Sequence, residues 1–195
     1  MRLYFSGPHG SGKSTLIEKI RDSSPEVFSL YPEDNLSFPK ITESYFERLK
    51  SKLLRYYFES LDQQKFEKEF PQKILLCSRC VYDSVAYSKA YLQLRWIDEK
   101  QYLQLEKITA TVFDNFPKRA IIVNPSLETL QKQLKQRWKS EEKKWNEENF
   151  AYLKAAQQEF SLLAETLREK ALYVPEEKLE DKVKKVMQWV NKFPK

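Results

Sequence analysis

The chain has 195 residues, of which 41% are hydrophobic and 14% aromatic, and its formal net charge is +6. This size and apolar content exclude an intrinsically disordered protein and favour a single domain over residues 1–195. No apolar run approaches the roughly 18 residues that cross a bilayer. We therefore expect a cytoplasmic protein with neither a leader peptide nor a membrane partner.

Short apolar runs typical of strands alternate with longer stretches of helical periodicity. The expected strands are residues 2–6, 27–31, 73–78, 119–124 and 171–174. The expected helices are residues 14–22, 42–70, 98–116, 126–138, 153–167 and 179–190, with Asp98 and Ser126 as N-caps. Three of the strands are nearly continuous apolar runs, as in strands covered on both faces. The alternation predicts an α/β fold in which five parallel strands form a sheet with helices on both faces.

All three glycines of the chain lie in the segment GPHGSGKS, residues 7–14. This segment matches the pattern G-x-x-x-x-G-K-[S/T] and stands between an expected strand and an expected helix, as a P-loop requires. Backbone N–H groups of such a loop bind phosphates. We therefore expect a P-loop NTPase fold that binds ATP and Mg²⁺, with Lys13 on the β- and γ-phosphates and Ser14 on the metal. The expected nucleotide-binding residues are Gly7, Pro8, His9, Gly10, Ser11, Gly12, Lys13, Ser14 and Thr15.

The third expected strand ends in LLCSR, which places Arg79 at the carboxyl end of a strand. Ligands of open α/β sheets bind at that edge, and arginine pairs well with phosphate there. An energy-transducing ATPase normally has an apolar strand that ends in Asp, which LLCSR lacks, so the motif favours transfer to a small acceptor. Cys77 and Cys80 are too few for a structural zinc site, and we interpret them as reduced thiols.

The segment SRCVYDSVAY, residues 78–87, resembles the D-R-x-x-x-S-x-x-A-[YF] pattern of the thymidylate kinases and the related deoxynucleoside kinases. Arg79, Ala86 and Tyr87 match this pattern, and Ser84 stands one place after its serine. Ser78 occupies the position that is usually acidic in the family. The resemblance implies that Arg79 lies on the side of the phosphoryl acceptor, together with Ser84 and Tyr87.

Other segments resemble the same family in chain order. The segment LYPED, residues 30–34, is similar to the end of the family's second strand, and Glu33 or Asp34 would orient or deprotonate an acceptor hydroxyl or hold Mg²⁺ through water. The segment before Arg137 is similar to the strand and helix that lead to a lid. The resemblance thus implies a helical lid at about residues 135–149, with Arg137 neutralising charge on the transferred phosphoryl group.

The expected helix at residues 42–70 carries Arg48, Lys52 and Arg55 on one face. In the resembling family this helix contacts the acceptor, and we hypothesise that Arg48 or Arg55 does so here. An exposed basic stripe explains the same spacing.

The sequence thus leads to three functional hypotheses. The first is ATP-dependent phosphoryl transfer to a nucleoside monophosphate such as dTMP, as in thymidylate kinases. The second is a deoxynucleoside kinase that acts on a nucleoside 5′-hydroxyl. The third is a regulatory or nucleic-acid-associated P-loop protein without kinase activity, although nothing beyond net charge suggests nucleic acid as a partner. The resemblance also suggests a homodimer.

Overall fold

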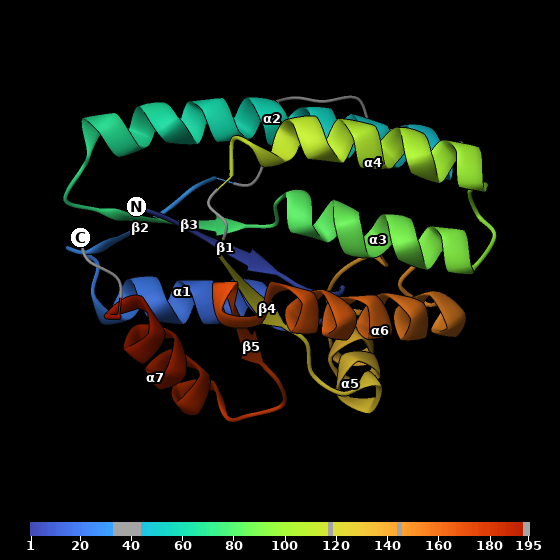
Figure 1. Ribbon diagram of the computed structural model, residues 1–195. Helices are drawn as coiled ribbons and strands as arrows, with labels where there is room; N and C mark the ends of the chain where they lie inside the picture. Colours follow the sequence, from blue (N-terminus) through green and yellow to red (C-terminus); the bar gives the residue numbers. More distant parts are fainter. Residues whose placement is uncertain (33–43, 117–118, 144–145, 193–195) are drawn as a thin grey trace.

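The computed structural model describes residues 1–32, 44–116, 119–143 and 146–192. Five strands form a parallel sheet in the order β2-β3-β1-β4-β5 (Figure 1). The strands are β1 (Arg2–Ser6), β2 (Phe28–Leu30), β3 (Ile74–Ser78), β4 (Ala120–Val123) and β5 (Ala171–Val174). The five expected strands and the predicted α/β sheet are therefore confirmed.

Seven α-helices and one 3-10 turn occupy the described parts of the chain. Asp98 and Ser126 cap their helices as expected, because each side chain accepts a hydrogen bond from a backbone N–H three residues later. The helical elements are α1 (Lys13–Ser23), α2 (Tyr45–Glu69), α3 (Val81–Gln93), α4 (Glu99–Phe113), α5 (Leu127–Arg137), α6 (Phe150–Leu167), η1 (Arg168–Lys170) and α7 (Leu179–Val190).

Successive side chains of each strand point to opposite faces of the sheet, and two hydrophobic clusters follow from this alternation. In β1, Leu3 and Phe5 pack into a cluster with α1 and α7, whereas Tyr4 packs into a cluster with α2, α3, α4 and α6. Figure 1 shows the two layers, with α1 and α7 on one side of the strands and α2, α3 and α4 on the other. Both faces of the sheet are therefore covered, which explains the apolar strands.

Helix α3 begins directly after Arg79 and was not among the helices expected from periodicity. It packs against α2, α4 and α6. Its buried residues are Val81, Tyr82, Asp83, Ser84, Ala86, Tyr87, Ser88, Ala90 and Tyr91. A helix that is buried on most sides has no polar stripe, so it gives no amphipathic signal.

The lid expected at residues 135–149 consists of the last turn of α5 and the connection from α5 to α6. The described residues of that connection, 138–143 and 146–149, form turns and bends rather than a helix.

Among the helices of the described residues, none combines the length and the apolar character needed to cross a membrane.

Candidate active site

The glycine loop follows β1 and leads into α1, as its motif requires. Gly7, Gly10 and Gly12 have φ angles of 151°, 74° and 82°, which side chains other than glycine rarely adopt. A Cβ atom on Gly7 would stand 2.1 Å from the backbone oxygen of Val123, and one on Gly10 would stand 2.6 Å from Cγ of Leu134. At Gly7 and Gly10 the loop therefore packs directly against the end of β4 and against α5, with no room for a larger residue.

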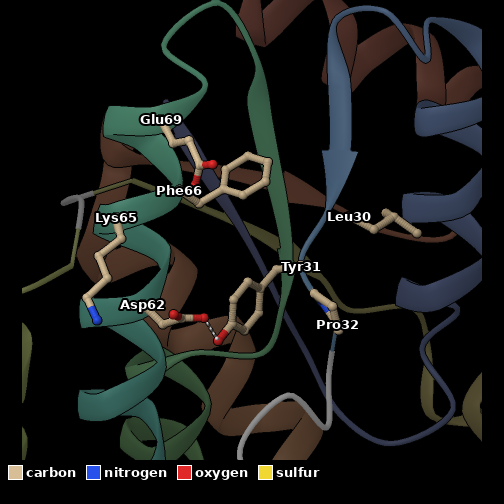
Figure 2. A pocket seen from close by; sticks show the side chains of 7 residues that line it. All are labelled: Leu30, Tyr31, Pro32, Asp62, Lys65, Phe66 and Glu69. Atoms are coloured by element: carbon tan, nitrogen blue, oxygen red, sulfur yellow. Dashed lines mark hydrogen bonds between the residues drawn. The ribbon is translucent and has the colours of Figure 1, made fainter.

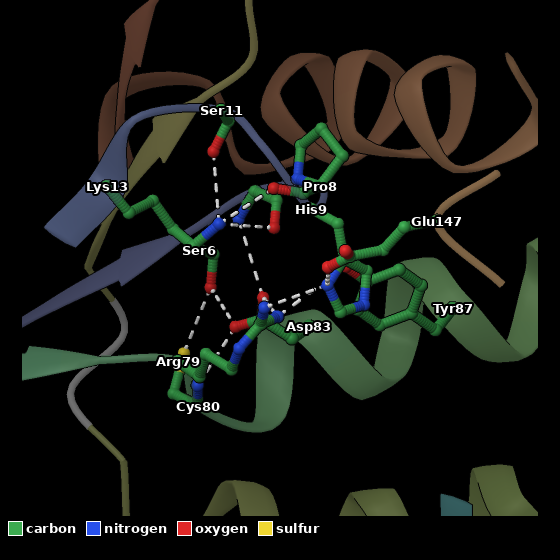
Figure 3. A network of polar contacts seen from close by, with 11 residues as sticks. Ser6, Pro8, His9, Ser11, Lys13, Arg79, Cys80, Asp83, Tyr87 and Glu147 are labelled. Carbon is green, nitrogen blue, oxygen red and sulfur yellow. Dashed lines mark hydrogen bonds and ion pairs between the residues drawn. The ribbon is translucent and has the colours of Figure 1, made fainter. Parts of the chain in front are cut away.

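Lys13 is buried inside this loop and contacts the loop's own oxygens (Figure 3). Its ammonium group donates to the carbonyls of Gly7 and Pro8 at 2.9 and 2.8 Å and to the Ser11 hydroxyl at 3.0 Å. The lysine is thus held where a triphosphate would enter the loop.

The N-terminus of α1 fits an anion. Gly12 takes the N-cap position in a left-handed conformation, and no described side chain caps the helix. The first-turn N–H groups and the positive end of the helix dipole are therefore directed at a ligand. Ser14 and Thr15 are exposed there. Ser14 lines a cavity of about 310 Å³ together with Glu18 and Ser78.

Arg79 stands between β3 and α3, next to the glycine loop. Its φ angle is 69°, a left-handed conformation that is strained for a residue with a side chain. Its guanidinium group lies 3.5 Å from the Asp83 carboxylate, 3.5 Å from the Tyr87 hydroxyl and 3.5 Å from Nδ1 of His9. Burial alone would lower the pKa of Arg79, but Tyr87 and Asp83 raise it overall. Arg79 therefore carries a fixed positive charge beside the loop.

Asp83 is a site residue that the sequence analysis missed. Its side chain is fully buried and accepts hydrogen bonds from the Ser6 hydroxyl at 2.8 Å, the Cys80 N–H at 2.9 Å and the Gly7 N–H at 3.4 Å (Figure 3). It thus joins the start of the glycine loop, the start of α3 and Arg79. A signal was present in the sequence, because an acid at the third position of a helix commonly caps it. Without α3 as an expected helix, that signal could not be used.

The connection between α5 and α6 contacts the loop through Glu147. This carboxylate is fully buried, and its Oε1 lies 3.1 Å from Nδ1 of His9. Its other oxygen pairs with Arg137 and accepts a hydrogen bond from the Trp138 indole at 3.3 Å. Arg137, the expected lid arginine, is therefore tied to the glycine loop by way of Glu147 and His9.

The electrostatics of His9 follow from its position. Burial, together with the charges of Arg79 and Lys52, lowers its pKa to about 3 against the opposing effect of Glu147. The imidazole is thus neutral near pH 7.

Helix α2 carries the basic residues Arg48, Lys52 and Arg55, and their contacts differ. The ammonium group of Lys52 lies 5.5 Å from the centre of the Tyr87 ring, and burial together with the charges of Arg79 and Arg48 lowers its pKa to about 7. Arg48 is partly buried, and burial lowers its pKa as well. Arg55 instead donates to Glu59 at 2.7 Å, an ion pair within the helix. Lys52 is therefore close enough to Arg79 for their charges to interact.

Of the remaining predicted site residues, the structure describes Tyr87 and Ser84. Tyr87 lies between Arg79 and the aromatic cluster of α3 and α6, with Tyr152 stacked at 5.9 Å. Ser84 is buried, and its hydroxyl has no hydrogen-bond partner among the described residues. Glu33 and Asp34 lie outside the described residues, so their roles stay predictions.

A second cavity, of about 430 Å³, lies between the end of β2 and α2 (Figure 2). There the Tyr31 hydroxyl donates to Asp62 at 3.0 Å, and Lys65 and Glu69 line the same groove. The groove reaches Pro32, the last residue described before 33–43, and we assign no ligand to it.

Both cysteines are buried free thiols, and burial raises the pKa of each. In the described ranges no group of three or more His, Cys, Asp or Glu side chains is arranged to hold a metal ion. Cys80 instead lies 3.2 Å from the Ser6 hydroxyl at the start of α3.

The parallel sheet, the glycine loop and the arginine at the next strand end together define a P-loop kinase. A model of the deoxynucleoside kinase family matches residues 3–194, and the chain belongs to that family. It is a kinase that transfers a phosphoryl group to a nucleoside or nucleotide. None of the curated proteins compared matches the sequence.

Solved structures share the fold at low sequence identity. A deoxyadenosine kinase from M. mycoides with bound dATP has a TM-score of 0.73 at 16% identity, covering 98% of this chain and 99% of that one. The same kinase with dCMP and dCDP has a TM-score of 0.71 at 15% identity, covering 99% and 100%. A thymidylate kinase from Candida albicans has a TM-score of 0.66 at 15% identity, covering 98% and 91%.

Proposed function

We propose that this protein is an ATP- and Mg²⁺-dependent deoxynucleoside kinase that phosphorylates the 5′-hydroxyl of a deoxynucleoside. The family match over residues 3–194 carries the choice of a deoxynucleoside over a monophosphate. The sequence alone favoured a monophosphate, so the preference between the two enzyme hypotheses is reversed.

The donor half of the proposed reaction uses the glycine loop. The N–H groups at the start of α1 and the ammonium group of Lys13 would bind the phosphates, and the Ser14 hydroxyl would hold Mg²⁺, which neutralises charge on the transferred group. These residues are the hydroxyl and cationic groups that a nucleotide–magnesium complex needs, so they fit it. The rest of the metal's ligands would be phosphate oxygens and water.

The acceptor half uses Arg79 and the aromatic side chains around it. Arg79 would stabilise negative charge on the transferred phosphoryl group, because its planar guanidinium presents paired donors to phosphate oxygens. Tyr45 and Trp96 stack on one another at 4.4 Å, and Trp96 stacks on Tyr152 at 5.5 Å. Such an aromatic wall next to Arg79 and Tyr87 suits the flat face of a base. Glu33 or Asp34 would deprotonate the acceptor hydroxyl.

One observation favours the second candidate, a deoxynucleoside monophosphate as acceptor. Arg48, Lys52 and Arg79 bring three cationic side chains toward one region, where Asp83 is the nearby anion. A phosphate on the acceptor would be attracted to this charge.

A substrate panel tests the proposal directly. Purified protein with ATP and Mg²⁺ is given deoxyadenosine, deoxycytidine, thymidine, the corresponding monophosphates and a short oligonucleotide, and phosphorylated products are separated by chromatography. We expect turnover of at least one deoxynucleoside at a higher kcat/KM than its monophosphate. Preference for a monophosphate would support the second candidate, and ATP binding without any transfer would refute both.

Two variants test the halves of the site separately. Lys13→Ala is expected to lower kcat by about 10³-fold with the fold retained, because the phosphate contacts of a P-loop act in the transition state. Arg79→Ala is expected to abolish transfer or raise the acceptor KM while ATP affinity is retained. Loss of ATP binding in Arg79→Ala would contradict the placement of Arg79 on the acceptor side.

The expected homodimer is kept as part of this proposal. Leu54 and Phe58 are 45% and 49% exposed and stand four residues apart on α2, so they share a face that a second copy would cover. Light scattering during gel filtration measures the mass, and a monomer at micromolar concentration would refute the dimer. The cytoplasmic compartment is also proposed, supported by the two free thiols.

A further inference from the structure

His9 is the only histidine in the chain, and one of its ring atoms faces two different partners. Its Nδ1 atom lies 3.1 Å from Oε1 of Glu147 and 3.5 Å from a terminal nitrogen of Arg79 (Figure 3). Glu147 belongs to the connection between α5 and α6, whereas Arg79 stands at the end of β3. The histidine itself belongs to the glycine loop, so three parts of the site meet at one nitrogen.

These two partners make opposite demands on Nδ1. An ionised carboxylate can only accept a hydrogen bond, so contact with Glu147 requires a proton on Nδ1. A guanidinium group can only donate, so contact with Arg79 requires the lone pair of Nδ1. A neutral imidazole carries its proton on one nitrogen at a time, and therefore Nδ1 can satisfy only one of the two.

The imidazole is neutral under ordinary conditions, because burial lowers its pKa to about 3. Its two tautomers thus correspond to two arrangements of the site. With the proton on Nδ1, His9 binds Glu147 and holds the lid connection. With the proton on Nε2, the lone pair of Nδ1 accepts from Arg79 instead. Nδ1 lies near both partners, so both arrangements are available before a ligand binds.

We propose that His9 is a positioning residue that couples the acceptor side to the lid, because Arg79 and Glu147 compete for its Nδ1 atom. The inference rests on the proposed position of Arg79 at the acceptor. When Arg79 turns toward an acceptor or the transferred phosphoryl group, the Nε2–H tautomer loses its partner. The Nδ1–H tautomer then predominates and fastens Glu147 to the glycine loop.

Fastening Glu147 also positions Arg137. The second carboxylate oxygen of Glu147 pairs with Arg137 and accepts from the Trp138 indole, so a held Glu147 keeps the lid arginine beside the loop. Binding on the acceptor side would thereby complete the charge around the donor phosphates. By linkage, a Glu147 held against His9 would also release Arg79 toward the acceptor.

The single histidine permits a direct test, because the side-chain ¹⁵N spectrum of the protein contains one imidazole. The chemical shifts of Nδ1 and Nε2 report which nitrogen carries the proton. In the ligand-free protein, Arg79→Met is expected to raise the ratio of Nδ1–H to Nε2–H by about fivefold or more, the lower end of typical site coupling. If Arg79→Met does not fold, Arg79→Lys serves, since its shorter chain moves the cation away from His9.

Arg55→Met is the matched control. It removes a guanidinium group from α2 that donates to Glu59 at 2.7 Å, and we expect no change in the tautomer ratio. Equal ¹⁵N shifts in the wild type and the Arg79 variants would overturn the proposal. So would a predominant Nε2–H tautomer in Arg79→Met.

A second measurement links the tautomer to the lid. In the wild type, the acceptor with the highest turnover is expected to slow amide hydrogen exchange in peptides of the α5–α6 connection. His9→Phe is expected to abolish this slowing, and His9→Asn, which keeps a side-chain donor, to restore part of it. Slowing of equal size in His9→Phe would refute the coupling.

The outcomes for the coupling and for the proposed function are distinguishable. The ligand-free ¹⁵N comparison requires no enzymatic turnover. If no acceptor is phosphorylated but Arg79→Met shifts the tautomer as expected, the proposed function fails while the competition for His9 stands. If an acceptor is phosphorylated and the tautomer does not respond, the function stands and the inference fails.

Discussion

Replacing Asp83 with asparagine tests whether this buried carboxylate holds the two halves of the site together. One of its oxygens accepts from the Ser6 hydroxyl at 2.8 Å and the Cys80 N–H at 2.9 Å. The other accepts from the Gly7 N–H at 3.4 Å and lies 3.5 Å from Arg79. The carbonyl of an asparagine can replace only one of these oxygens. Its NH₂ group would then face two other donors and no acceptor.

The size of the effect follows from these contacts. Breaking a buried ion pair by removing one partner costs about 3–5 kcal/mol, and a hydrogen bond to a charged group contributes about 1.5–3 kcal/mol. Asp83→Asn keeps its two shorter hydrogen bonds, and the side chain of Arg79 is 26% exposed. We therefore expect a loss of about 2–4 kcal/mol in the free energy of unfolding. For a chain of this length the melting temperature would fall by about 4–16 °C.

Thermal unfolding followed by circular dichroism measures the loss, with Asp98→Asn as the control. Asp98 is an exposed N-cap whose carboxylate accepts from Gln101 N–H at 2.7 Å, and asparagine caps as well as aspartate. The control is expected to change stability by less than about 0.5 kcal/mol. A loss below about 1 kcal/mol for Asp83→Asn would refute the argument that Asp83 ties the loop to Arg79.

Three further predictions concern the loop and its charged neighbours. Gly7→Ala is expected to lower the free energy of unfolding by more than about 4 kcal/mol in denaturant, because its Cβ would meet a backbone oxygen at 2.1 Å. Gly12→Ala has only the strain of a positive φ angle, and we expect it to lower the free energy of unfolding by about 1–2 kcal/mol. The pKa of His9 is about 3 in the folded state and 6.5 in the unfolded state, so the unfolded state binds more protons between these pH values. The free energy of unfolding therefore falls as the pH falls from 6.5 to 3. His9→Asn should flatten that slope. The pKa of Lys52 is about 7, so kcat/KM should fall as pH rises through 7, and Lys52→Arg should remove the fall because arginine stays charged. Unchanged pH profiles in either variant would contradict these assignments.

The sequence predicted the sheet and the donor loop well because their signals are local. A strand covered on both faces is an apolar run, and a loop with positive φ angles needs glycine, so both features appear in a few adjacent letters. The N-caps Asp98 and Ser126 were likewise readable from a single side chain. The ends of several elements differ from the expected bounds, for example those of β2, which spans Phe28–Leu30 instead of 27–31.

The surroundings of Arg79 were harder to predict because they are made by contacts between distant residues. Asp83 becomes meaningful only when α3 places it under Ser6, which is 77 residues away in the chain. Glu147 stood in a polar segment that suggested a solvated surface, yet its carboxylate is fully buried against His9 and Arg137. His9 was included only as a variable loop position, since nothing in the loop motif names its partners. Pattern and spacing do not encode such long-range pairs.

The contacts of Lys13 affect how tightly the loop would hold a nucleotide before and after transfer. The ammonium group already has three oxygen partners in the loop, so an incoming triphosphate would have to displace these oxygens. The affinity for a nucleotide then reflects only the difference between phosphate oxygens and the loop's own oxygens. A diphosphate would offer the lysine its β-phosphate but no γ-phosphate, so it would compete less well with the oxygens of Gly7, Pro8 and Ser11. The loop thus acts as its own displacing ligand and favours release of the spent donor after transfer.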